Sequence, residues 1–108
     1  MTAAEIPLDI NQLRANAAAA GQLLKALGKP DRLLLLCQLS QGELNVGELE
    51  SLLGIGQPTL SQQLAVLRRE GLVETRREGK QIYYRISSPA ALAVIGTLYQ
   101  QFCGGTTP

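Results

Sequence analysis

The stretch from Asn45 to Ser87 reads NVGELESLLGIGQPTLSQQLAVLRREGLVETRREGKQIYYRIS and carries most of the information about the architecture. Its apolar residues follow a helical period, pause at two glycines, follow that period again and then alternate as in a strand. This order predicts a helix, a tight turn, a second helix and a two-stranded hairpin. A helix-turn-helix places its second helix in a DNA groove, so the pattern indicates DNA binding.

Residues 46–69 form the predicted helix-turn-helix. Gly54 and Gly56 mark its turn, because glycine tolerates positive φ. Pro58 suits the first turn of the second helix, where its missing N–H costs nothing, and Gly71 is placed to end that helix in a left-handed cap. Two apolar stripes face the expected core: Val46, Leu49, Leu52 and Leu53 on the first helix, and Leu60, Leu64 and Leu67 on the second.

Residues 72–86 form the predicted wing. Val73 and Thr75 alternate with Glu74 and Arg76, which is the period of a strand. The run from Gln81 to Ile86 alternates again, and the segment from Arg77 to Lys80 contains a turn-forming glycine. The alternative from pattern alone is a small α+β domain with a solvated hairpin.

Charge is concentrated in this region. The chain has a formal net charge of +1, but residues 57–85 carry six Lys or Arg against three Asp or Glu. Phosphates would lie against such a patch. We therefore predict that the exposed polar face of the second helix reads bases and that the basic side chains hold the backbone. The candidate DNA-binding residues are Gln57, Thr59, Ser61, Gln62, Arg69, Arg76, Arg77 and Lys80.

The length of 108 residues fits one domain, residues 1–108. No segment approaches the roughly 20 apolar residues that a membrane span requires. The N-terminal MTAAEIPLDI has neither the basic nor the apolar region of a signal peptide, so we expect a cytoplasmic protein.

Helices are also predicted at residues 9–27 and 89–103, on either side of the DNA-binding unit. The first has a heptad-like seam and the second an apolar face. We expect these helices to form a homodimer, which suits an inverted-repeat operator. The alternative is that they pack only on their own core. The seam is Ile10, Leu13, Ala17, Ala20, Leu24 and Leu27, and the face is Ala91, Ile95, Leu98 and Phe102.

The whole pattern resembles the ArsR/SmtB family of winged-helix transcription regulators. The resemblance covers about Leu13 to Cys103, and its most specific parts are LGKPDRL from Leu27, VGEL from Val46, QPTLSQQL from Gln57 and LRREGLV from Leu67. It implies a mainly α fold of about five helices with a two-stranded wing. It also implies a homodimeric repressor that leaves its double-stranded operator DNA when an inducer binds.

Many members of that family sense metals, and this sequence departs from them. One family site uses Glu-Leu-Cys-Val-Cys, where this chain reads Glu43-Leu44-Asn45-Val46-Gly47. Another uses histidines, of which the chain has none. Because zinc prefers imidazole or several thiolates, we predict no metal site and no cofactor.

Cys37 and Cys103 are the only cysteines. A buried lone thiol is often inert, but cytoplasmic proteins make little structural use of disulfides, so a potential pair is more typical of redox sensing. Two cysteines at these positions resemble the branch of the biofilm growth repressor (BigR), SqrR and HlyU-type regulators. That resemblance implies a dithiol switch in which persulfides link the cysteines and DNA is released. We expect Cys103 to attack and Cys37 to resolve.

Alternatives remain open at this point. Peroxide or a soft metal such as Cu(I) or Hg(II) could act on the same thiols, no inducer could act at all, and a HlyU-like activator or anti-silencer could replace the repressor. A winged helix that binds protein is disfavoured by the basic patch. An enzyme is not expected, because the chain has no histidine, no Gly-rich phosphate loop and no paired acid and base.

Overall fold

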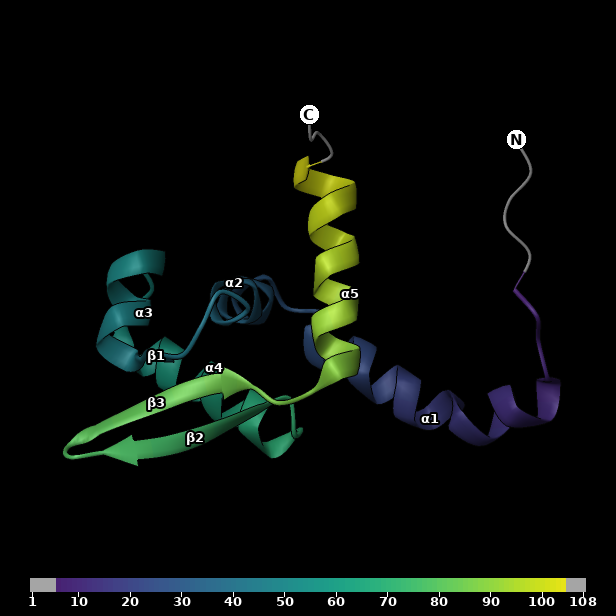
Figure 1. Ribbon diagram of the computed structural model, residues 1–108, viewed down its shortest axis with the longest axis horizontal. Coiled ribbons are helices and arrows are strands. Elements are labelled where there is room, and N and C mark those ends of the chain that lie inside the picture. The colour runs from purple at the N-terminus through teal and green to yellow at the C-terminus, as the bar shows by residue number, and fades with distance from the viewer. Residues whose placement is uncertain (1–5, 105–108) are drawn as a thin grey trace.

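The computed structural model describes residues 6–104, so the first five and last four residues of the predicted domain lie outside it. Figure 1 shows a winged helix-turn-helix, and within the described range the prediction of a mainly α fold with five α-helices and a wing is confirmed. The elements in chain order are α1 (Ile10–Leu27), α2 (Pro30–Leu39), β1 (Leu44–Asn45), α3 (Val46–Leu53), α4 (Gln57–Arg69), β2 (Val73–Glu78), β3 (Gln81–Ile86), α5 (Pro89–Tyr99) and a π-helical turn (Gln100–Gly104).

The core is built around α2, which contacts α1, α3, α4 and α5. Its Leu35 and Leu36 are fully buried, as is Leu49 of α3. The predicted stripe of α4 is buried as well, and α5 adds Ala91 and Ile95. A single apolar centre therefore fixes how α4 is turned, and the opposite face of α4 remains exposed.

The ends of the helix-turn-helix are closed by local hydrogen bonds. Asn45 and Glu48 form a reciprocal capping box at the start of α3, with side-chain to backbone distances of 2.8 and 2.9 Å. At the end of α4, the N–H of Gly71 bonds to Arg68 O and that of Leu72 to Leu67 O. Gly71 has a φ of 75°, the left-handed conformation that this cap requires.

The wing has one strand more than the sequence indicated. It is an antiparallel sheet of three strands in the order β1-β3-β2, with Leu44 opposite Tyr84. The prediction of two strands missed β1, because two residues are too few to show alternation. The turn is also tighter than predicted, since Arg77 and Glu78 belong to β2 and only Gly79 and Lys80 connect the strands.

The first helix projects away from the rest of the chain, on the side opposite the wing (Figure 1). Every residue from Ile10 to Gln22 is exposed, and only Ala26 and Leu27 of α1 are buried. The predicted seam therefore has no counterpart on its own chain along most of its length. In the described part of the chain, none of the helices is long and apolar enough to cross a membrane.

Candidate functional site

The exposed face of α4 carries the predicted base-reading residues. Gln57, Thr59, Ser61 and Gln62 are all exposed, and Arg69 lies exposed at the end of the helix. Because the leucines of α4 are fully buried, these polar side chains point away from the core. The helix thus presents a continuous row of hydrogen-bonding groups of the kind that contacts base edges.

Gln63 is an exception on this helix. Its side chain is 6% exposed and therefore buried. It lies among the leucines and accepts a hydrogen bond of 2.9 Å from Arg32 Nη1. A polar residue within an apolar stripe was the available signal, and the sequence prediction did not use it.

The three basic residues predicted for the wing have different surroundings. Arg76 bonds to Glu43 and Glu78, both at 2.8 Å, and its guanidinium lies 4.8 Å from the centre of the Tyr83 ring. The hydrogen bonds that Arg76 donates to Glu78 and then to Glu43 raise the pKa of Arg76. Arg76 is therefore held within the wing, which leaves little of its charge for a phosphate.

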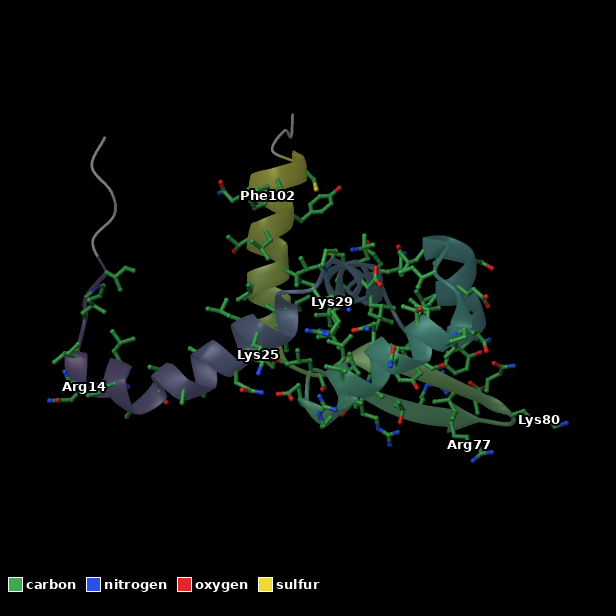
Figure 2. The ribbon with its side chains drawn as sticks, turned by 180° about the vertical axis from the view of Figure 1, so that it is seen from behind. Arg14, Lys25, Lys29, Arg77, Lys80 and Phe102 are labelled. Atoms are coloured by element: carbon green, nitrogen blue, oxygen red, sulfur yellow. The ribbon has the colours of Figure 1, made fainter. Side chains whose placement is uncertain are left out.

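Arg77 and Lys80 lie at the tip of the wing and extend outward (Figure 2). The only side-chain bond of Arg77 in the described part of the chain is from Nε to Gly79 O, at 3.2 Å. The tip therefore presents two cations to solvent. The wing follows α4 directly in the chain, and β2 contacts α4.

The two cysteines line one cavity, between α2 and the end of α5. Both are free thiols, Cys37 half-buried and Cys103 exposed. They open into one apolar cavity of about 220 Å³, lined by Leu33, Cys37, Ile95, Leu98, Tyr99, Phe102 and Cys103. The fold thus brings together two thiols that are 66 positions apart in the sequence.

The environments of the two thiols differ. Burial raises the pKa of Cys37, and the nearby Cys103 raises it further, because two thiolates repel each other. Burial therefore disfavours the thiolate form of Cys37. Cys103 lies at the surface, where a reagent from solution can reach it. Since the thiolate is the nucleophile, Cys37 is poorly suited to attack first.

A change in helical winding turns Cys103 toward this cavity. The α-helix predicted through Cys103 ends at Tyr99, and Gln100–Gly104 is a π-helix. At about 100° per residue, a continuous α-helix would place Cys103 roughly 80° from Ile95. The wider π turn advances less per residue and brings Cys103 back toward the face of Ile95. Just before it, Thr97 Oγ1 bonds to Ala93 O, and such a bond weakens the helical ladder.

The region of the family metal motif has a different role in this chain. Asn45 caps α3 through its side-chain oxygen, and Glu43 is paired with Arg76. Within residues 6–104 no group of three or more His, Cys, Asp or Glu side chains is arranged to hold a metal ion.

Comparisons with known proteins identify the family to which this chain is similar. Residues 29–75 match the model of the family described as "Bacterial regulatory protein, arsR family". The chain is 56% identical to the biofilm growth-associated repressor of Agrobacterium fabrum, over 92% of this chain and 83% of the relative. It is 44% identical to the transcriptional activator HlyU of Vibrio cholerae, over 90% of each.

Solved structures show the same fold. The crystal structure of the transcriptional repressor BigR from Xylella fastidiosa matches with a TM-score of 0.84 and 49% identity, over 90% of this chain and 99% of that one. The homodimeric winged helix-turn-helix DNA-binding domain of Mb0332 from Mycobacterium bovis matches with a TM-score of 0.70 and 28% identity, over 99% and 98%.

Proposed function

The chain belongs to the ArsR family of bacterial transcription regulators, and we propose that it is a repressor controlled by reactive sulfur species. In this proposal a homodimer binds an inverted-repeat operator in double-stranded DNA. It leaves the operator when a persulfide links Cys37 to Cys103. The observation that carries the proposal is that the two cysteines of the chain open into one apolar cavity.

The DNA-binding part rests on the exposed surface of α4 and the wing tip. Gln57, Thr59, Ser61 and Gln62 supply donors and acceptors for base edges, whereas Arg77 and Lys80 supply charge for phosphates. Arg69 lies exposed at the end of α4, with its Nε 3.7 Å from Glu70 Oε2. Arg76 contributes by fixing the wing.

The homodimer rests on the exposed apolar surface of α1. Ile10 is 54% exposed, Leu13 47% and Leu24 62%. Isolated helices gain little stability in water, so an apolar helix of this kind requires a partner surface. A second copy supplies a matching seam, and the homodimeric neighbour from M. bovis has the same fold. Two copies would present two recognition helices to two half-sites.

The sensing chemistry follows from the two thiol environments. The thiolate of Cys103 attacks the sulfane sulfur of a persulfide RSSH, which leaves a Cys103 persulfide and a thiol RSH. Cys37 then attacks the Cys103 sulfur, which forms the disulfide and releases hydrogen sulfide. Two protein thiols are oxidised and one sulfane sulfur is reduced. A further persulfide equivalent would lengthen the bridge by one sulfur atom.

The test begins with reduced protein and an operator selected from genomic fragments. Mass spectrometry after exposure to a persulfide should show the loss of both thiols within one chain, and fluorescence anisotropy should show release of the operator. Peroxide, Cu(I) and Hg(II) are tested in parallel. If one of these reagents releases the operator and persulfide does not, the proposed inducer is wrong. The proposal that the chain is a DNA-binding regulator would still stand.

A second candidate has support from one comparison. The activator HlyU of V. cholerae is 44% identical over 90% of this chain. The same dithiol site would then control an activator or anti-silencer. A reporter gene fused to the selected operator separates the two, because deleting a repressor raises expression and deleting an activator lowers it.

A further inference from the structure

One arginine connects the helix of the thiol site to the recognition helix. Arg32 lies in the first turn of α2, and its Nη1 donates to Gln63 Oε1 of α4 at 2.9 Å. Its Nε donates to Ala26 O at 2.5 Å and its Nη2 to Lys25 O at 3.2 Å. Both carbonyls belong to the last turn of α1, where a cation is favourable, and Lys25 O also accepts the N–H of Gly28. One side chain thus joins α1, α2 and α4.

The acceptor on α4 is unusual in its surroundings. Among residues 6–104, Gln63 is the only polar side chain that is buried. Leu60, Leu64 and Leu67 around it make non-directional contacts that allow small shifts of the helix. A buried amide instead requires its donor in a narrow range of positions, because losing the hydrogen bond leaves a desolvated polar group. The Arg32–Gln63 bond therefore restricts the rotation of α4 about its axis.

The position of α2 makes this bond sensitive to the thiols. Cys37 lies on the same helix, five residues after Arg32, and faces α5 across the thiol cavity. Arg32 faces the opposite way, toward α1 and α4. Both residues lie on this one helix of 10 residues. Any displacement of Cys37 toward Cys103 is therefore transmitted to Arg32 and to the bond with Gln63.

We propose that Arg32 is a positioning residue that, through Gln63, sets the rotation of α4 on the DNA and couples it to the state of the two thiols. The coupling part rests on the proposed function, because it takes the two-thiol switch as its input. The positioning part applies to the reduced protein alone. If Arg32 only held α1 against α2, its loss would lower stability. It would change neither the discrimination between DNA sequences nor the response to persulfide.

The principal variant is Gln63→Met, which keeps the volume of the side chain and removes the acceptor. Arg32 keeps both carbonyl bonds, and because it is half-buried its freed Nη1 can donate to water. We expect thermal stability close to that of the wild type. The ratio of cognate to scrambled DNA affinity should fall about tenfold, within the roughly 5–150-fold range of allosteric couplings. The loss of affinity caused by persulfide should shrink by a similar factor.

Two further variants complete the design. Arg32→Lys keeps the charge near the end of α1 but cannot reproduce the three bonds of the guanidinium. It should therefore reproduce both effects of Gln63→Met, on the ratio of cognate to scrambled affinity and on the ratio of affinities before and after persulfide. Gln41→Met is the matched control, because it also exchanges glutamine for methionine and removes one bond, to Ser40 Oγ at 3.1 Å. It should keep both ratios at the wild-type values.

The outcomes separate this proposal from the proposed function. If Gln63→Met keeps both wild-type ratios, or loses stability with both ratios unchanged, Arg32 has no positioning role. If the wild type does not release DNA under persulfide, the proposed function fails, and the ratio in the reduced state still decides the positioning role. Should Gln63→Met not fold, the NMR signal of the Gln63 side-chain amide in the wild type decides, because its oxygen accepts from Arg32 Nη1: an unchanged signal before and after persulfide treatment overturns the coupling.

Discussion

Arg76 of β2 bonds to Glu43, which lies 33 positions earlier in the chain, with 2.8 Å between Nε and Oε1. The same guanidinium reaches Glu78 at 2.8 Å and lies over the ring of Tyr83. These contacts tie the wing to the segment that leads into β1. They assign Arg76 a mechanical role in the wing, and they distinguish it from its neighbour Arg77 at the tip.

Arg76→Ala and Arg77→Ala should therefore affect DNA binding in different ways. Arg77→Ala removes a phosphate contact, so the slope of log K against log salt should fall by about one unit. Arg76→Ala should weaken binding with nearly the same slope, because the wing loses its anchor. Glu43→Gln should reproduce the Arg76→Ala result. If the slope falls equally in both arginine variants, Arg76 contacts a phosphate after all.

Gln62→Ala and Lys80→Ala test how base reading and phosphate contacts are divided. Gln62 is exposed on α4, so its loss should weaken cognate binding by about 1–3 kcal/mol and change scrambled DNA little. Lys80 is at the wing tip, and its loss should weaken both DNAs alike. Anisotropy titrations on the two sequences measure this. An equal loss on both sequences for Gln62→Ala would contradict its assignment.

The two-thiol switch predicts that each cysteine is required for release. Cys37→Ser and Cys103→Ser should bind the operator as the reduced wild type does, because neither thiol contacts the DNA-binding surface. Neither variant should release DNA under persulfide. Cys37→Ser should still accumulate a persulfide on Cys103 by mass spectrometry, whereas Cys103→Ser should react slowly. Normal release from either variant excludes an intramolecular link as the signal.

The raised pKa of Cys37 predicts its reactivity with pH. Alkylation by iodoacetamide follows the thiolate fraction. In Cys103→Ser, burial still raises the pKa of Cys37. Its alkylation should be slower than that of free cysteine near pH 7 and should keep rising with pH after free cysteine levels off. A plateau at or below the pH found for free cysteine would show that the thiol is not shielded in solution.

The capping box of α3 predicts a local stability effect. Asn45→Ala should lower the free energy of unfolding by about 1 kcal/mol, because the N–H of Glu48 loses its acceptor. Asn11→Ala, an exposed change in the first turn of α1, should stay within about 0.5 kcal/mol. Urea denaturation measures both. Equal stabilities would mean that water replaces the cap of α3 at no cost.

The sequence predicts most of the fold because its strongest signals are periodic. The leucines of α4, the glycine after it and the alternation of the wing each specify a local structure by spacing alone. The strand β1 was missed because it is two residues long and is held by pairing with β3. The π turn was missed because it differs from an α-helix only in hydrogen bonding, which residue types scarcely reveal.

In the candidate site, too, the features set by local spacing could be predicted and those set by distant partners could not. The outward position of Gln62 follows from helical spacing, and the structure agrees with it. The burial of Gln63 and the engagement of Arg76 depend on partners far along the chain, Arg32 and Glu43. Such pairings depend on tertiary structure. The meeting of Cys37 and Cys103 in one cavity is likewise a property of how α2 and α5 pack.

The exposure of α1 also affects how fast the protein is degraded when a cell holds few copies of it. In the proposed homodimer, a helix whose seam is open from Ile10 to Gln22 gains its stability from association, so the melting temperature should rise with protein concentration. A chain that has not yet found a partner offers this helix to proteases. Turnover would then remove single chains faster than assembled ones, and the number of copies in a cell would have a lower bound set by the association constant.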